Sequence, residues 1–335
     1  MKAVFRLLKL LVALLLLLIV AATCWVAWFT QQPVRLPPAP YELVLKHGSS
    51  LNAIARQMTN EGVLSEPWTF IALVRAQGRA GDIKAGNYAL REGMTHYDLF
   101  LMITDGVTTQ RSITFIEGWT FRQMRDALNR NEDVRHLSMA MTDQEILRQI
   151  GAKESIAEGL FFPDSYHFDS GMSDLEILKR AYEMMQRRLA KSWENRAPGL
   201  PYGSPYEALI MASIIEKETG LASERPQIAS VFLNRIKLGM RLQTDPTVIY
   251  GLGEHFDGNL RKRDLTQDTA YNTYTRDGLP PTPIAMPGGA AIEAALHPAQ
   301  SKALYFVGKG DGSHAFSTNL DDHNRAVRRY QLGRN

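Results

Sequence analysis

The sequence predicts an α+β protein that follows a single N-terminal transmembrane helix. Two observations support this fold class. An uncharged apolar run lies near the N-terminus, and a short strand recurs three times ahead of a glycine, a helix cap and an apolar helix. The recurring units begin at unequal intervals, which excludes a solenoid of regular repeats. We therefore expect small α+β units whose strands pair in short sheets.

The transmembrane helix is predicted over residues 10–29, which carry no charge. At 1.5 Å per residue such a helix spans about 30 Å, the thickness of one bilayer core. Three basic residues precede it: Lys2, Arg6 and Lys9. The positive-inside rule then places residues 1–9 in the cytoplasm and the rest of the chain outside.

A cleaved signal peptide is the alternative for this segment. The apolar run is long for a signal peptide, and the bulky Trp25, Trp28 and Phe29 follow the small residues that could imitate a cleavage site. The two tryptophans also suit the outer interface of a membrane. These features favour an uncleaved anchor.

Composition limits the chemistry of the external part. The one cysteine, Cys24, lies in the apolar segment, so there is no disulfide framework and no cysteine nucleophile or ligand outside it. The net charge of +3 suits residence near anionic envelope polymers, and no basic run of the nucleic-acid-binding type is present. His297, His314 and His323 are too scattered in the sequence to indicate a metal site. We expect no metal and no cofactor.

Residues 30–40 are rich in proline and predict an extended spacer that holds the rest of the chain off the membrane. Three segments with one template follow it, at 41–58, 87–103 and 112–128. Each template contains a glycine and, two residues later, a candidate helix cap. The three pairs are Gly48 with Ser50, Gly93 with Thr95, and Gly118 with Thr120. Thr95 with Asp98, and Thr120 with Gln123, have the spacing of capping boxes.

The first unit, residues 41–106, has a further apolar helix starting near Ser65 and a strand from Ile83 to Leu90. The order is strand, helix, helix, strand. Its run Gly48–Ala55, GSSLNAIA, resembles the LysM peptidoglycan-binding module. The resemblance implies a LysM-like subdomain that binds peptidoglycan. A plain α+β spacer is the alternative.

Residues 107–200 are expected to form an α+β connecting region that becomes helical from Thr142. Two capping boxes are predicted there, Thr142 with Glu145 and Ser173 with Glu176. Between them lies the aromatic-rich turn 158–168, EGLFFPDSYHF. Its side chains could line a sugar groove, although packing in a core is the alternative role for Phe161 and Phe162.

A helix with a well-marked start is predicted in residues 204–220. Ser204 can be its N-cap, Pro205 occupies the first helical position, and Glu207 can reach back to the cap. We expect Gly220 to end the helix.

Glu218 continues the apolar stripe of this helix. Four bulky apolar residues share its face: Ile210, Met211, Ile214 and Ile215. Glu216 lies on the other side, over smaller residues. Burial disfavours the charged form of a carboxyl, so Glu218 is a candidate general acid, and glycoside cleavage often uses such an acid. The alternative is an ordinary solvated glutamate in the last helical turn.

The run 212–219, ASIIEKET, resembles the end of the catalytic helix of lysozyme-like lytic transglycosylases, with Glu218-Thr219 as the characteristic pair. Further runs lie at 158–166, 241–253, 270–288, 295–299 and 304–324. Together they resemble the YceG-like family, the endolytic murein transglycosylases of bacterial inner membranes. The resemblance extends over essentially the whole chain and implies a lysozyme-like, mixed α+β catalytic domain over residues 201–335.

The resemblance implies cleavage of the β-1,4 bond between N-acetylmuramic acid and N-acetylglucosamine within peptidoglycan strands, leaving 1,6-anhydro ends. Glu218 would protonate the bridging oxygen and then act as base for the sugar's own 6-hydroxyl. The implied location is the inner membrane with a periplasmic catalytic domain. The implied role is to limit the length of nascent strands near peptidoglycan synthases.

Other candidate substrate-binding residues follow the predicted catalytic helix. They are Gln243, Thr244, Asp245, Tyr250, Tyr271, Asn272 and Tyr274. The first three could bind sugar hydroxyls or orient Glu218, or Asp245-Pro246 could form a turn. The alternating Tyr and Thr of 271–274 could equally be an ordinary strand. The glycine-rich residues 307–313 predict a hairpin turn.

Two alternative functions remain open at this stage. One is a hydrolytic muramidase on the same scaffold, in which water attacks C1 of the sugar. The other is a non-catalytic glycan-binding scaffold for division or elongation, in which the LysM-like subdomain binds the glycan.

Overall fold

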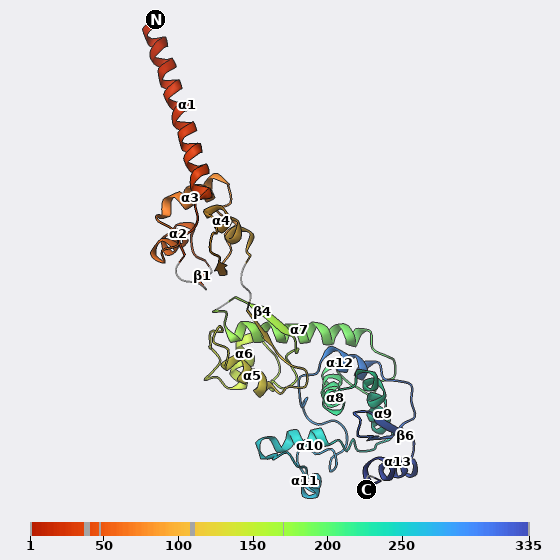
Figure 1. The fold of residues 1–335 in the computed structure, drawn as a ribbon. Helices are drawn as coiled ribbons and strands as arrows, with labels where there is room; N and C mark the ends of the chain where they lie inside the picture. The colour runs from red at the N-terminus through yellow and green to blue at the C-terminus, as the bar shows by residue number, and fades with distance from the viewer. Residues whose placement is uncertain (1, 37–40, 47, 108–110, 170, 334–335) are drawn as a thin grey trace. The chain divides into compact units, whose positions relative to one another are not determined.

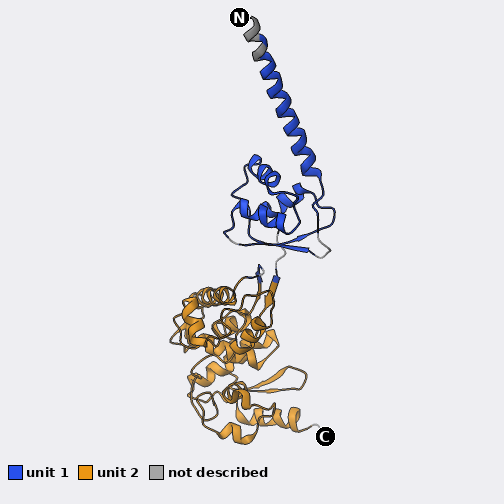
Figure 2. Ribbon diagram, turned by 90° about the vertical axis from the view of Figure 1, so that its left-hand side faces the viewer, with its two compact units in different colours: residues 1–111, 167–171 blue, residues 112–166, 172–335 orange. Residues whose placement is uncertain are grey.

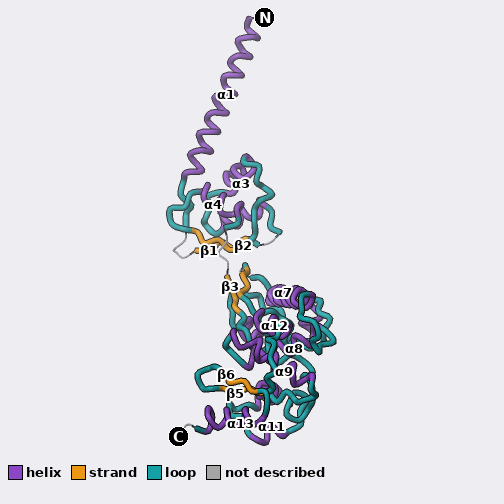
Figure 3. Tube along the Cα trace, turned by 90° about the vertical axis from the view of Figure 1, so that its right-hand side faces the viewer, coloured by secondary structure: helices purple, strands orange, loops and turns teal. Residues whose placement is uncertain are grey.

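The computed structural model describes residues 2–36, 41–46, 48–107, 111–169 and 171–333. The chain forms two compact units, which comprise residues 1–111 with 167–171, and residues 112–166 with 172–335 (Figure 2). Helices predominate, and the described strands pair in three two-stranded ribbons (Figure 3). The prediction of a mixed α+β fold with short paired strands is therefore confirmed.

The first helix, α1 (Lys2–Gln31), is long and apolar (Figure 1). Residues Lys9–Gln31 are long and apolar enough to cross a membrane, and the 18-residue window that passes this test is not buried in the protein. The predicted segment 10–29 lies within this stretch. The helix is consistent with a membrane anchor or a signal sequence.

The first unit continues with two strands and three helices. They are β1 (Tyr41–Leu45), α2 (Leu51–Asn60), α3 (Pro67–Ala76), β2 (Gly86–Leu90) and α4 (His96–Asp105). β1 and β2 are antiparallel, with Tyr41 opposite Leu90. The predicted order of strand, helix, helix and strand is confirmed, although α3 begins at Pro67 rather than near Ser65 and β2 begins at Gly86 rather than Ile83.

The three glycine-and-cap templates form as predicted. The φ angles of Gly48, Gly93 and Gly118 are +76°, +82° and +78°, a left-handed conformation that glycine adopts without a Cβ clash. The side chains of all three caps accept hydrogen bonds at the starts of their helices, α2, α4 and α5 (Phe121–Asn129). The capping boxes of α4 and α5 are both complete.

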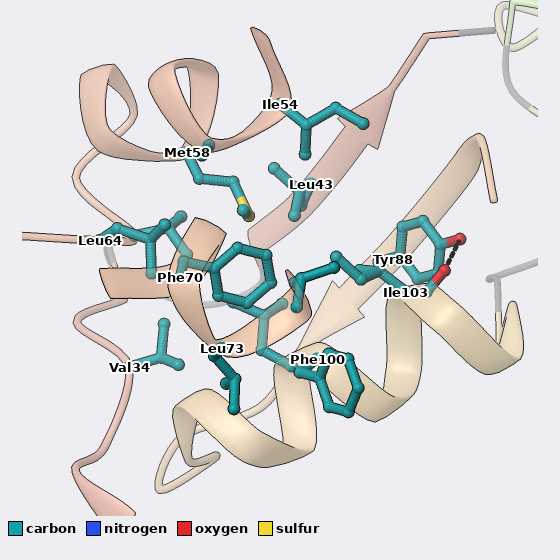
Figure 4. Packing of buried hydrophobic residues seen from close by; sticks show 14 of the residues in the cluster. Val34, Leu43, Ile54, Met58, Leu64, Phe70, Leu73, Tyr88, Phe100 and Ile103 are labelled. Carbon is teal, nitrogen blue, oxygen red and sulfur yellow. Dashed lines mark hydrogen bonds between the residues drawn. The ribbon is translucent and has the colours of Figure 1, made fainter. Parts of the chain in front are cut away.

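The core of the first unit lies between its ribbon and its helices (Figure 4). Leu43, Met58, Phe70 and Tyr88 are fully buried there. The Tyr88 hydroxyl is satisfied because it donates to the carbonyl oxygen of Lys84 at 2.7 Å. Burial of this tyrosine therefore leaves no unpaired hydroxyl in the core.

The prediction of an extended spacer over residues 30–40 is wrong for its described part. Val34 is only 6% exposed and belongs to the core of the first unit. Its N–H donates to the carbonyl oxygen of Met94 at 2.7 Å, and Leu36 packs against the same core. These apolar side chains bury themselves in spite of the neighbouring prolines. Residues 37–40 lie outside the described residues.

The end of α1 packs directly on the first unit. Trp25 stacks on Trp68 of α3, with ring centroids 5.1 Å apart and an interplanar angle of 6°. Phe29 is 8% exposed and lies against the ring of His96, at a centroid distance of 4.3 Å. The helix therefore continues into the first unit through aromatic contacts.

The rest of the described chain contains nine α-helices, four strands and three short helical turns, and β3 and β4 each include residues assigned to both units. The strands are β3 (Arg111–Thr114), β4 (Ser165–Phe168), β5 (Tyr305–Gly308) and β6 (His314–Ser317). The helices besides α5 are α6 (Asp143–Ile150), α7 (Asp174–Glu194), α8 (Pro205–Glu218), α9 (Arg225–Lys237), α10 (Asp245–Leu252), α11 (Lys262–Thr266), α12 (Gly289–Leu296) and α13 (Leu320–Val327). The short turns are η1 (Ala222–Glu224), η2 (Gly253–His255) and η3 (Arg328–Leu332).

Helix α8 lies at the centre of the second unit and packs against α7, α9, α10 and α12. All of residues 208–215 are buried. The Ser213 hydroxyl donates to the carbonyl of Ile210 and accepts the N–H of Ile284, at 2.7 and 3.0 Å. The helix is therefore buried around its whole circumference, and not only along the stripe seen in the sequence.

Several local predictions for the second unit are confirmed. The boxes at Thr142 and Ser173 cap α6 and α7. Phe161 and Phe162 are buried, which confirms their role in core packing. Strands β5 and β6 form the expected antiparallel hairpin around residues 307–313.

Other local predictions are wrong. Gly220 does not end α8, because the helix stops at Glu218 and Thr219 is already extended, with φ of −143°. Glu207 reaches back one residue further than expected and accepts the N–H of Gly203 at 2.7 Å. Asp245-Pro246 begins helix α10 rather than a turn, since proline is well tolerated in a first helical turn. Residues 271–274 form turns rather than a strand.

Removing part of the α8 core has a predictable cost. We expect Ile214→Ala to lower the free energy of unfolding by about 2–5 kcal/mol, because Ile214 is fully buried and its loss leaves a cavity. Leu238→Ala, at a site 64% exposed, should change it by less than about 0.5 kcal/mol. Urea unfolding of the full chain in detergent, followed by tryptophan fluorescence, measures both. Equal effects would contradict this packing.

Candidate active site

A cavity of about 500 Å³ opens in the second unit at the end of α8, and we call it the acid cavity. Its wall is formed by the end of α8, by α9, by the segment 242–245, by the β5–β6 hairpin and by α13. The polar side chains that line it include Glu218, Arg235, Gln243, Asp245, Tyr274, Tyr305, His314, His323 and Asn324. Three of the predicted site residues besides Glu218 therefore meet in one place.

Glu218 is the last residue of α8 and lies partly buried in the wall of this cavity. Its Oε2 accepts a hydrogen bond from the Thr244 hydroxyl at 2.9 Å. Burial raises the pKa of Glu218 to about 7, and the negative charge of Asp245 acts in the same direction. The hydrogen bond from Thr244 and the positive charges of His314 and Arg235 oppose this shift. The predicted increase in the pKa of Glu218 is confirmed.

Glu216, two residues earlier, has a different environment. One oxygen of its carboxylate pairs with Arg225 at 3.0 Å, and the other accepts the N–H of Gly288 at 2.9 Å. Burial also raises the pKa of Glu216, although both contacts act against that shift. The two contacts tie Glu216 to neighbouring elements, and it does not line the acid cavity.

The backbone that carries Thr244 is strained and firmly held. Gln243 has a φ of +50° and is the one non-glycine residue with positive φ in the described part of the chain. Such a conformation is unfavourable for a side chain with a Cβ. It is held by the Thr273 carbonyl, which accepts the N–H of Gln243, and by the Thr273 hydroxyl, which accepts the N–H of Thr244, both at 3.1 Å. The strain places the Thr244 hydroxyl against Glu218.

Asp245 and Tyr274 form a second fixed pair in the acid cavity. The Tyr274 hydroxyl donates to Oδ1 of Asp245 at 2.6 Å. Burial raises the pKa of Tyr274, and the hydrogen bond to Asp245 raises it further. The hydroxyl therefore stays protonated at neutral pH and holds the Asp245 carboxylate in place.

A cationic and aromatic group that also lines the acid cavity was not predicted from the sequence. Arg235 donates to the carbonyls of Leu304 and Leu242 at 2.7 and 2.8 Å, and its guanidinium lies over the ring of Tyr305. The ring of His323 stacks on the ring of Tyr305, with the two centroids 5.2 Å apart. The sequence does not indicate this cluster because Leu304, which accepts from Arg235, lies 69 residues further along the chain.

Two of the three histidines that are far apart in the sequence, His314 and His323, line the acid cavity. His314 bonds to Glu224, with Nδ1 2.7 Å from Oε2, and His323 stacks on Tyr305. His297 lies elsewhere, beside Asn195. Among the described residues no group of three or more metal-ligating side chains is assembled.

Three predicted substrate-binding residues lie outside the acid cavity. Tyr250 and Tyr271 line a different cavity and contact each other edge to face, with centroids 4.9 Å apart. Asn272 is 1% exposed, and its amide donates to the carbonyls of Asp264, Leu265 and Gln267. Asn272 therefore holds the loop before Thr273 together, because its polar atoms already have backbone partners.

A buried carboxylic acid at the end of a core helix, held by one hydroxyl and facing a polar cavity, defines a site for acid–base chemistry of the kind that glycoside-cleaving enzymes use. Comparison with known proteins agrees with this class. The YceG-like family profile matches residues 43–329, and the chain belongs to this family.

Curated relatives extend over most of the chain. The chain is 33% identical over 305 residues to a protein of Bacillus subtilis named endolytic murein transglycosylase, covering 86% of this chain and 84% of that protein. It is 26% identical to a Streptococcus pneumoniae protein of the same name, of which it covers 57%. A crystal structure of a putative YceG-like protein from Listeria monocytogenes matches with a TM-score of 0.54 and 30% identity, covering 86% of this chain and 99% of that one.

The raised pKa of Glu218 makes stability depend on pH. Between the usual pKa of 4.5 and the raised value of about 7, the folded state binds a proton that the unfolded state releases, so stability falls as pH rises through this range. We expect Glu218→Gln to be more stable than wild type by about 1–3 kcal/mol at pH 8, and equal to it at pH 4.

Thermal or urea unfolding at the two pH values tests this expectation. Glu132→Gln, at an exposed position of the same unit, is the matched control and should show no gain at pH 8. A Glu218→Gln protein without a pH-dependent gain would contradict the buried acid.

Proposed function

We propose that this protein is an endolytic lytic transglycosylase that cleaves the β-1,4 bond between N-acetylmuramic acid and N-acetylglucosamine within peptidoglycan strands. The proposal rests above all on Glu218, a buried acid whose pKa is near 7 and whose carboxyl faces a polar cavity. The homology to proteins named endolytic murein transglycosylase supports this substrate and this reaction.

In the first step Glu218 donates its proton to the bridging oxygen as the bond from C1 to that oxygen breaks. The leaving sugar keeps this proton as a new hydroxyl, and C1 gains positive charge. In the second step the Glu218 carboxylate removes the proton of the 6-hydroxyl of the same muramic acid, whose oxygen bonds to C1. The anhydro ring closes, Glu218 is protonated again, and no water is consumed.

The surroundings of Glu218 suit both steps. A pKa near 7 allows the carboxyl to lose and regain its proton at neutral pH with little cost. Thr244 orients the carboxyl through Oε2, which leaves the other oxygen for the substrate. Asp245, held by Tyr274, supplies negative charge to the same cavity and would stabilise the developing cation at C1. Gln243 and Asn324 are the groups that we assign to sugar hydroxyls or acetamido groups.

The remaining parts of the chain fit the same function. We assign α1 as an uncleaved single-pass anchor of the inner membrane, with residues 1–9 in the cytoplasm and the chain after residue 30 in the periplasm. We assign residues 41–106 as a LysM-like subdomain that binds glycan, residues 107–200 as the connecting region, and residues 201–335 as the lysozyme-like catalytic domain. The biological role would be to limit the length of nascent strands near the synthases.

Removing the acid should abolish the reaction. We expect Glu218→Gln to lower the rate of anhydro-end formation by roughly 10²–10⁴-fold, because the amide cannot donate the proton to the leaving oxygen. Glu132→Gln should keep wild-type activity. Mass spectrometry of digested peptidoglycan measures the products. Continued strand cleavage by Glu218→Gln would refute the assignment of the acid, and reducing ends from wild type would show a hydrolytic muramidase instead.

The pH profile should reveal the same group. Because the first step needs protonated Glu218, kcat/KM should fall about tenfold per pH unit above a pKa near 7. Thr244→Val removes the hydrogen bond that stabilises the carboxylate, so this alkaline limb should move to higher pH. Thr318→Val, at an exposed position, serves as control. An unchanged limb in Thr244→Val would contradict the role of Thr244.

A further inference from the structure

A second cavity of about 790 Å³ lies in the same unit and has no part in the mechanism described above. We call it the side cavity. Its lining includes Phe121, Ile156, Glu158, Lys217, Ile249 and Tyr250. Its size is within the range of pockets that bind a small ligand.

Consecutive residues line the two cavities at two places along the chain. Lys217 lines the side cavity and Glu218 lines the acid cavity. In the same way, Pro246 lines the side cavity and Asp245 lines the acid cavity. Consecutive residues on α8 and α10 therefore contribute to the two cavities, which makes the side cavity the candidate site for a group attached to a sugar beside Glu218.

The side cavity is poorly suited to another sugar. Several of its polar groups already have partners: the Gln123 side chain accepts the N–H of Thr120 at 2.8 Å, and the Tyr250 hydroxyl donates to Glu158 at 3.1 Å. Ile156, which is 44% exposed, and the half-buried Ile249 contribute apolar surface. The Gln123 oxygen and the Tyr250 hydroxyl proton are therefore already engaged and are not free for a sugar hydroxyl.

The same lining suits a short peptide with carboxylate groups. Lys217 donates one hydrogen bond to the carbonyl of Gly118 at 3.2 Å and keeps two further N–H donors for an anion. Glu158 is 7% exposed and is fixed by the N–H of Phe121 and the hydroxyl of Tyr250, both at 3.1 Å. In its ionised form the carboxylate has about four acceptor sites, and Phe121, Tyr250 and the N–H of Gly159 occupy three, so one is left for a peptide N–H.

We propose that the side cavity binds the peptide stem of the muramic acid whose glycosidic bond is broken at Glu218. The inference rests on the proposed function, because the stem leaves the same sugar ring that reacts in the acid cavity. The apolar side chains would contact the small methyl groups of the stem, and Lys217 would pair with a stem carboxylate. The enzyme would then prefer strands that still carry their peptides.

Binding measurements separate this proposal from the catalytic one. The probes are soluble glycan strands of matched length, either with stems or after an amidase has removed them. The protein is the full chain in detergent with Glu218→Gln, which leaves the strands intact. Ile156→Asp adds a negative charge to the side cavity at a partly exposed position, and Leu238→Asp, at a site 64% exposed outside both cavities, is the matched control.

We expect the Glu218→Gln protein to bind stem-bearing strands about tenfold more tightly than stripped strands, a difference of about 1.4 kcal/mol. Adding Ile156→Asp should abolish this difference and leave the affinity for stripped strands unchanged, and adding Leu238→Asp should change neither. Equal affinities for both strands, or an equal loss for both in Ile156→Asp, would overturn the proposal. Absence of anhydro ends from the wild-type protein would refute the proposed function, while the binding result would still decide on the side cavity.

Discussion

The site depends on the burial of one carboxyl group at the end of a helix that is itself buried on all sides. Four other helices pack against α8, so Glu218 directly follows a segment that forms the centre of the second unit. The single hydrogen bond from Thr244 is enough to orient Glu218 but does not abolish the effect of desolvation, so the pKa stays near 7. The rigid core thus sets both the position and the proton affinity of the acid.

The neighbouring Glu216 shows how strongly local partners decide the use of a buried carboxylate. Both glutamates belong to the last turn of α8, and burial raises the pKa of each. One carboxylate oxygen of Glu216 pairs with Arg225, and the other accepts the N–H of Gly288. These contacts connect α8 to other elements. Glu218 has one hydroxyl partner and a cavity beside it. Glu216 is therefore suited to support the fold, and Glu218 is suited to exchange a proton.

Local rules predicted the elements well, because caps, glycines and periodicity act over a few residues. Helix caps such as Thr95 and Thr120, and the apolar stripe that ends at Glu218, were all readable in the sequence. The failures came from contacts that are distant in the sequence. Val34 joins a core built by later residues, and the positions of Arg235 and of Asn272 depend on loops folded around them. Composition made Tyr271 and Asn272 look like sugar ligands, although the fold uses the asparagine internally.

The aromatic contacts at the end of α1 have a mechanical consequence. Trp25 and Phe29 belong to the apolar helix, yet they pack on Trp68 and His96 of the first unit, and Val34 follows directly into its core. In the proposed anchored protein, no flexible linker would separate the membrane-spanning residues from the folded core of the first unit. That unit would travel with its helix as one body and keep a constant height above the bilayer, so it would sample only the layer of wall polymer nearest the membrane.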